Sequence, residues 1–223
     1  MRITHSLMND SKACRNNDGG NGEKGSPRCE RWFVYFIRQW LACYNDCIVA
    51  GIYEGGIAVI KAIRGDITKL RDVSYICNAA NGIGPMGGGV AAAIRKAGGR
   101  EIEEEAINVC KEQNPQPGDL YVTRAGTLPF QGIIHLVTMK QPAGATSYDI
   151  VKTCLHNLVD YCQKHGIDKV ALPALGTGVG NLDKTKVAAI FKEVLEPVKD
   201  IEFIVVDIDE AFIALFAESG NIS

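Results

Sequence analysis

From residue 56 onward, the chain alternates between short apolar segments typical of β-strands and longer amphipathic segments typical of α-helices. Strands that alternate with helices pair side by side in parallel, and the connecting helices cover both faces of the sheet. The sequence therefore predicts an α/β sandwich with a mostly parallel central sheet. We expect strands at residues 57–67, 73–81, 118–126, 132–139, 169–175 and 201–208. We expect helices at residues 87–98, 101–113, 147–166 and 182–198, followed by a short helix near the C-terminus.

The composition of the chain changes near residue 55. Residues 11–28 are polar and glycine-rich, so they bury too little apolar surface to offset the entropy of ordering them. Residues 32–53 are apolar but contain Arg38 and Asp46, and such charges disfavour the alternative of a transmembrane helix. We therefore predict a low-complexity and apolar leader at residues 1–54, partly disordered, and a folded domain at residues 55–223.

Charge and cysteine content narrow the partners and the compartment. The formal net charge is −2, so the chain has no general attraction to nucleic acid, and an anionic ligand needs a local site. Eight cysteines without a cleavable signal peptide predict reduced thiols and a cytoplasmic protein. Among the first four cysteines only Cys43 and Cys47 are close, a spacing that does not fit a zinc ribbon or finger. We predict no metal site, and the sequence gives no oligomeric state.

Polar and glycine-rich stretches follow three of the predicted strands. Ligands of parallel sheets bind beyond the carboxyl ends of the strands, so these stretches are where a binding site is expected. They are residues 64–68 (RGDIT), 78–90 (NAANGIGPMGGGV) and 173–180 (PALGTGVG).

Two of these stretches contain glycine loops that could bind an anion. Gly87, Gly88 and Gly89 precede a predicted helix whose first amides lack internal acceptors, and glycine lets that backbone approach a ligand closely. Residues 176–180 (GTGVG) form a second loop of this kind. Two such loops could hold a diphosphate without lysine or arginine, although each could also be only a tight turn. Neither a G-x-G-x-x-G fingerprint nor a P-loop is present, which disfavours a dinucleotide dehydrogenase and a P-loop ATPase.

Three polar side chains at the strand ends complete the candidate site. Asn78 and Asn81 can each donate and accept hydrogen bonds, which suits vicinal ribose hydroxyls, although asparagine is also a common turn residue. Asp66 can accept a hydrogen bond from an exocyclic amine such as that of adenine. Its alternative role is the N-cap of the segment that follows it.

These motifs, in this order, resemble those of macrodomains, which are ADP-ribose-binding modules. The resemblance rests on GDIT, NAAN followed by GGGV, and PALGTGVG, together with PGDLYVTRAGTLP and IIHLVTM, and it covers about residues 57–216. It implies a macrodomain at residues 55–223, with a three-layer α/β/α sandwich around a mostly parallel, mixed central sheet.

The resemblance also implies roles for individual residues. Asp66, with the backbone of Ile67, corresponds to the acceptor of the adenine amine. Asn81 corresponds to the residue that orients the distal ribose, and it is the candidate catalytic residue of this chain. Asn78 resembles a support of that loop. The first phosphate loop corresponds to Gly87, Gly88, Gly89 and Val90. The second corresponds to Gly176, Thr177, Gly178, Val179 and Gly180.

Whether the chain is an enzyme depends on further positions. One hydrolase branch of the family has an aspartate and a histidine where this chain has Ala91 and Arg95. Other members also have alanine there, and their hydrolysis is attributed largely to substrate positioning and a water near the phosphate. Many members have an aromatic residue at the position of Gly180, so the glycine is expected to open the distal-ribose side. A branch with a catalytic lysine and aspartate is not matched at Gly180 either.

The leading hypothesis is a macrodomain that binds ADP-ribose and hydrolyses its esters, such as O-acetyl-ADP-ribose or mono-ADP-ribosylated acidic residues. The alternative is a reader that binds ADP-ribose without turnover. ADP-ribose or an ADP-ribosylated protein is the expected partner, with no cofactor, and neither nucleic acid nor a membrane is supported by the sequence.

Several conspicuous residues have structural interpretations. We expect His135 to be a core histidine satisfied by backbone groups, Cys77 to be a buried small hydrophobe, and Asp183 to cap the helix that begins near Lys184. The acidic run at residues 101–105 is expected to form a solvated helix face.

Overall fold

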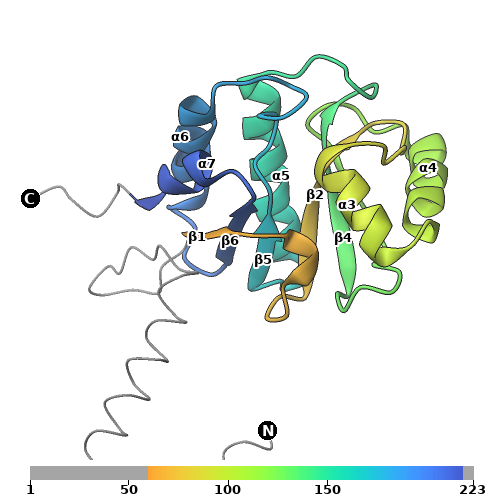
Figure 1. Cartoon of the computed structure of the whole chain (residues 1–223), viewed down its shortest axis with the longest axis horizontal. Helices are drawn as coiled ribbons and strands as arrows, with labels where there is room; N and C mark the ends of the chain where they lie inside the picture. The colour runs from red at the N-terminus through yellow and green to blue at the C-terminus, as the bar shows by residue number, and fades with distance from the viewer. Residues whose placement is uncertain (1–59, 218–223) are drawn as a thin grey trace, which may run out of the picture. The chain divides into compact units, whose positions relative to one another are not determined.

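The structure is a computed structural model that describes residues 60–217 (Figure 1). A six-stranded sheet with the order β1-β6-β5-β2-β4-β3 lies between two layers of helices, which confirms the predicted α/β/α sandwich. The strands are β1 (Ile60–Arg64), β2 (Tyr75–Asn81), β3 (Leu120–Thr123), β4 (Gly132–Met139), β5 (Lys169–Leu172) and β6 (Glu202–Asp207). The helices are η1 (Ile67–Lys69), α3 (Gly89–Gly98), α4 (Glu101–Gln113), α5 (Tyr148–His165), α6 (Lys184–Leu195) and α7 (Glu210–Ala214).

Five strands of this sheet run in the same direction. β1, β6, β5, β2 and β4 pair in parallel, and β3 pairs antiparallel with β4 at the edge of the sheet. Because parallel strands end on the same side, the loops that follow β1, β2, β5 and β6 all leave from the carboxyl edge of the sheet, where the strands end. This edge is the place where the sequence predicts a ligand site.

The two faces of the sheet are covered by different helices. α5, α6 and α7 cover one face, where Cys77, Leu155 and Phe191 are fully buried. α3 and α4 cover the other face, where Ile94 and Ile133 are fully buried. Cys77 is therefore the small buried core residue that we expected, and burial raises the pKa of its thiol.

Local capping sets where the larger helices begin and end. α5 begins after Ser147, whose hydroxyl accepts a hydrogen bond from the backbone N–H of Ile150, and it ends at Gly166 in the left-handed conformation. Asp183 accepts from the backbone N–H of Lys186 at 3.0 Å, so its predicted role as the cap of α6 is confirmed.

Parts of the sequence interpretation lie outside the described residues. These are the leader at residues 1–54, its cysteines, the domain boundary near residue 55 and the apolar segment at residues 32–53. Between residues 60 and 217, no helix is long and apolar enough to cross a membrane. The same residues contain no group of three or more His, Cys, Asp or Glu side chains placed to hold a metal ion.

The acidic run at the start of α4 is not only a solvated face, which corrects our expectation. Glu103 accepts a hydrogen bond from the backbone N–H of Met86 at 2.6 Å and pairs with Arg95 at 3.0 Å. The pKa of the Glu103 carboxyl is lowered, first by the Met86 hydrogen bond and then by Arg95. Glu103 therefore joins α4 to α3 and fixes the residue that precedes Gly87.

We predict that Glu103→Ala destabilises the protein by about 1–3 kcal/mol, because it leaves the Met86 N–H and Arg95 without their acceptor. Glu104→Ala is the matched control, since Glu104 is exposed in the same turn of α4. We expect it to change stability by less than about 0.5 kcal/mol. Urea unfolding of both variants measures the difference, and equal losses would contradict the role given to Glu103.

Candidate functional site

The predicted site residues meet at the carboxyl edge of the sheet. Asp66 follows β1, Asn81 ends β2, and residues 173–180 follow β5. The glycines at 87–89 lead from the β2 loop into α3, and α3 packs against η1. Segments that are far apart in the sequence therefore lie on the same side of the sheet, at the carboxyl ends of its parallel strands.

Asp66 caps the short helix η1. Its Oδ1 atom accepts hydrogen bonds from the Thr68 backbone N–H at 3.0 Å and from the Thr68 hydroxyl at 2.7 Å. We had predicted that the first strand continues to Ile67. It ends at Arg64 instead, because residues 66–69 turn into η1. Ile67 is 3% exposed and packs into the core beneath α3. The capping role that we had considered as an alternative is present, and the adenine contact stays a prediction.

Asn81 organises the loop between β2 and α3. Its Oδ1 atom accepts from the backbone N–H groups of Ile83 at 3.1 Å and Gly84 at 2.9 Å, and its Nδ2 donates to the Pro85 carbonyl at 2.8 Å. The side chain thus holds the path of the chain toward the first glycine loop. We had predicted that Asn78 supports this loop, and the structure shows that Asn81 does so instead.

Asn78 belongs to a buried polar network instead. Its Nδ2 lies 3.0 Å from Nδ1 of His135, and the His135 Nε2 lies 2.9 Å from the Thr123 hydroxyl. Asn78 is 1% exposed, so a ligand contact by its side chain would require it to leave this network. His135 is a core histidine as predicted, but side chains rather than backbone groups satisfy it.

Burial determines the protonation of His135. Its ring is fully buried and stacks on Tyr121 with centroids 4.5 Å apart, and burial lowers its pKa to about 3. The imidazole is therefore neutral near pH 7. It is not available as a general base at the strand-end site, since it lies inside the sheet layer.

The first glycine loop is open to solvent. Gly87, Gly88 and Gly89 are exposed, and a Cβ atom at any of them would have no heavy atom within 4 Å. Gly89 has φ +55, and Gly88 caps α3 without a side-chain acceptor for its first amides. Val90 is half-buried behind the loop. Exposed glycines at the start of a helix suit an anion, and anion binding at this loop stays a prediction.

The second glycine loop is packed closely against the start of α5. Bonds from Asn181 N to Gly178 O and from Leu182 N to Gly176 O close the turn at 3.0 and 3.1 Å. A Cβ at Gly180 would lie 2.4 Å from Cγ2 of Thr146 and 2.6 Å from Gly176 O. Gly180 is thus required by close packing, and the opening of the distal-ribose side at this glycine stays a prediction. At the tip of the loop, Gly178 is exposed, Thr177 is half-buried and Val179 is 64% exposed.

The sequence motifs and the arrangement of the loops agree with one family. Residues 77–191 match the Macro domain family. The chain belongs to the macrodomain family. An uncharacterized protein of Aquifex aeolicus is 40% identical over 158 residues, which are 69% of this chain and 93% of that protein. Pantoea vagans O-acetyl-ADP-ribose deacetylase 1 is 36% identical over 143 residues, covering 61% of this chain and 81% of its own length.

Solved structures support the same assignment. A variant of the Oceanobacillus iheyensis macrodomain with ADPR has a TM-score of 0.63 and 26% sequence identity, over 71% of this chain and 90% of that chain. The Thermus aquaticus DarG macrodomain has a TM-score of 0.60 and 27% identity, over 69% of this chain and 99% of that chain. The match to these structures fits the six-stranded mixed sheet and its two helical layers.

The positions that carry acid and base groups in one hydrolase branch hold structural residues in this macrodomain. Ala91 is 8% exposed and lies on the face of α3 that packs into the core. Arg95 is paired with Glu103, so its guanidinium serves the contact between α3 and α4. Neither position supplies a titratable base to the strand-end site.

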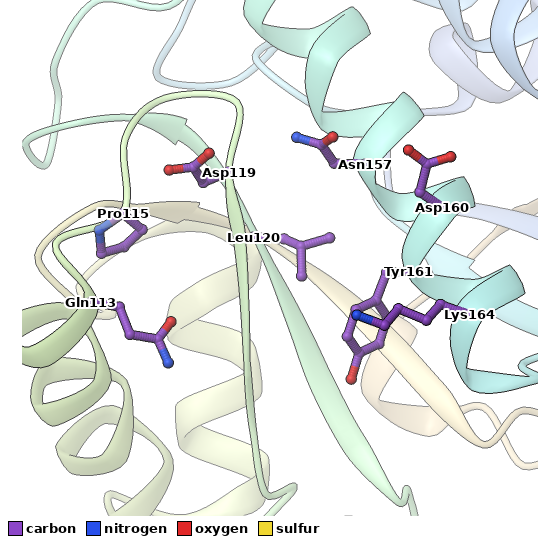
Figure 2. Close-up of a pocket in the computed structure, with 8 residues that line it drawn as sticks. All are labelled: Gln113, Pro115, Asp119, Leu120, Asn157, Asp160, Tyr161 and Lys164. Carbon is purple, nitrogen blue, oxygen red and sulfur yellow. The ribbon is translucent and has the colours of Figure 1, made fainter.

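A pocket of about 350 Å³ lies elsewhere, at the edge strand β3. Figure 2 shows its lining side chains on both sides of β3, from the end of α4 and from α5. They are Gln113, Pro115, Asp119, Leu120, Asn157, Asp160, Tyr161 and Lys164. None of the predicted site residues lines this pocket, so it is separate from the strand-end site.

Two residues that shape the glycine loops, Glu103 and Thr146, were not predicted from the sequence. Glu103 lies 17 positions from Met86, and Thr146 lies more than 30 positions from Gly180. No local spacing could have connected them, because each contact joins segments that come together only in the folded chain.

We predict that His135 makes the macrodomain less stable at acidic pH. Its pKa is about 3 when folded and about 6.5 when unfolded, so below pH 6.5 only the unfolded chain binds the proton. The contribution of neutral His135 to the free energy of unfolding is fully present above pH 6.5. It falls by about 1.4 kcal/mol per pH unit toward pH 3. Urea unfolding of the wild type and His135→Gln between pH 5 and 7 measures this. Parallel pH profiles for the two proteins would contradict the prediction.

Proposed function

We propose that this macrodomain binds ADP-ribose at the strand-end site and hydrolyses ADP-ribose esters, either O-acetyl-ADP-ribose or mono-ADP-ribosylated acidic residues of a protein. The observation that carries the proposal is the arrangement of two glycine loops with Asp66 and Asn81 at one sheet edge. Structures of relatives carry ADPR or ADP in their names, and one relative is named an O-acetyl-ADP-ribose deacetylase.

The two ends of the ligand would be recognised by different chemistry. Asp66 uses Oδ1 for Thr68, which leaves Oδ2 as the acceptor for the adenine amine, with Ile67 packed beneath it. The exposed amides at Gly87–Gly89 and the loop at 176–180 would donate to the diphosphate. Since both loops use neutral backbone donors, they fit a chain with a net charge of −2.

Hydrolysis at this site would depend on positioning rather than on a protein base. Ala91 has no titratable group, Arg95 is paired with an acidic residue of α4, and His135 is buried in the core. The loops and the Asn81 turn would hold the ester and stabilise developing charge, and a phosphate of the substrate would assist the attacking water.

A non-catalytic reader of ADP-ribose is the second candidate, and Ala91 is the observation that favours it. A paired assay on the full chain separates the two. Calorimetry measures binding of ADP-ribose, and release of free ADP-ribose is measured from O-acetyl-ADP-ribose and from a glutamate-modified protein. Binding with release supports the hydrolase, binding without release supports the reader, and no heat with ADP-ribose would overturn the whole site assignment.

Asp66 is predicted to contribute through its free oxygen. Asp66→Ala and Asp66→Asn should both weaken ADP-ribose binding by about tenfold or more, because a hydrogen bond to a charged acceptor is lost. Only Asp66→Ala should lower the melting temperature, since asparagine keeps an acceptor for the Thr68 N–H. Calorimetry and thermal melting give the two readouts, and unchanged affinity in Asp66→Asn would remove the adenine role.

Asn81 is predicted to affect turnover more than binding. Asn81→Ala loses the bonds that hold residues 83–85, so a bound ester would be misplaced while the diphosphate contacts remain. We expect a fall in kcat of about tenfold or more with a smaller change in the ADP-ribose Kd. Asn81→Asp keeps the acceptor and loses only the donor to Pro85, so it is the control. Equal losses in kcat and affinity would contradict an orienting role.

A further inference from the structure

The hydroxyl of Thr146 is buried without a hydrogen-bond partner. Such a group costs free energy, and native structures seldom keep one without a reason. Among the described residues, two other buried side-chain atoms share this condition, Asn78 Oδ1 and Glu202 Oε1. Glu202 Oε1 lies 2.6 Å from Lys61 Nζ in an ion pair, and Asn78 belongs to the His135 network. Thr146 is the one that contacts a candidate ligand loop.

Thr146 touches both ends of the second glycine loop. Its Cγ2 atom would lie 2.4 Å from a Cβ at Gly180 and 3.4 Å from one at Gly176. Thr146 directly precedes Ser147, the N-cap of the 18-residue helix α5, so a long helix fixes its position. The methyl group therefore sets how closely the loop approaches α5, and the buried hydroxyl is bonded to the same Cβ atom as this methyl group.

We propose that Thr146 is a positioning residue for the second glycine loop, whose hydroxyl donates a hydrogen bond to a loop carbonyl when the loop binds a diphosphate. The inference rests on the proposed function. A carbonyl oxygen can accept two hydrogen bonds, so the loop offers acceptors even where its turn is already closed. The free energy that the unpartnered hydroxyl costs is then recovered on binding, which adds to the affinity for the ligand.

This arrangement makes stability and affinity respond in opposite directions. Thr146→Val keeps the shape and the methyl contact but removes the hydroxyl, so the protein alone should melt no lower than the wild type. ADP-ribose and ADP should bind about fivefold to tenfold more weakly to it. Thr146→Ser keeps the hydroxyl but loses the methyl contact, so it should bind ADP-ribose more tightly than Thr146→Val does. A purely structural threonine would lose stability and affinity together.

Calorimetry and thermal melting of the full chain test the inference. Thr153→Val in the first turns of α5 is the control, because the Thr153 hydroxyl donates to the Asp149 carbonyl at 2.8 Å, within the helix. It should leave the affinity unchanged. If the wild type binds ADP-ribose and Thr146→Val binds it equally well, the inference is overturned while the proposed function stands. A wild type that binds neither ADP-ribose nor ADP would overturn the proposed function and the inference with it.

A crystal structure of the wild type with ADP-ribose gives a direct check. We expect the Thr146 Oγ1 atom within about 3.0 Å of a carbonyl oxygen of residues 176–180. A hydroxyl that still lacks an acceptor there would overturn the inference, whatever the affinity of the variants.

Discussion

The parallel pairing of β1, β6, β5, β2 and β4 is the constraint on which the rest of the structure depends. It brings the ends of strands that are far apart in the sequence to one edge, where each is followed by a loop. The helices that return the chain must then cover both faces, which builds the two halves of the core. A site at this edge combines short polar segments from distant parts of the chain, none of which could bind a ligand alone.

The two glycine loops at that edge are supported differently. The first is open to solvent, and its position is fixed from behind by Glu103 through Met86 and Arg95. The second is compact, because Gly176 and Gly180 lie against Thr146 at the start of α5. Glycine therefore serves access in one loop and close packing in the other. The same residue type has two physical reasons within one site.

The polar groups of the sheet are divided between the core and the edge. Asn78 and Thr123 each bond one ring nitrogen of His135 inside the protein, where burial keeps the imidazole neutral. At the edge, Asp66 and Asn81 use part of their hydrogen-bonding capacity to hold their own loops. The proposed chemistry accordingly relies on fixed dipoles and positioning, which need no group that titrates near neutral pH.

The sequence by itself determined the order of strands and helices, the mostly parallel sheet, the cap Asp183, and the three strand-end segments of the candidate site. These follow from hydrophobic periodicity and from glycine and cap residues, which act over a few positions. The sequence left the cap at Asp66 as one of two roles. Only the tertiary structure decided that Asn81 rather than Asn78 braces the loop, that side chains satisfy His135, and that Thr146 fills the space at Gly180. Those features depend on contacts between elements far apart in the chain, and no local pattern encodes such contacts.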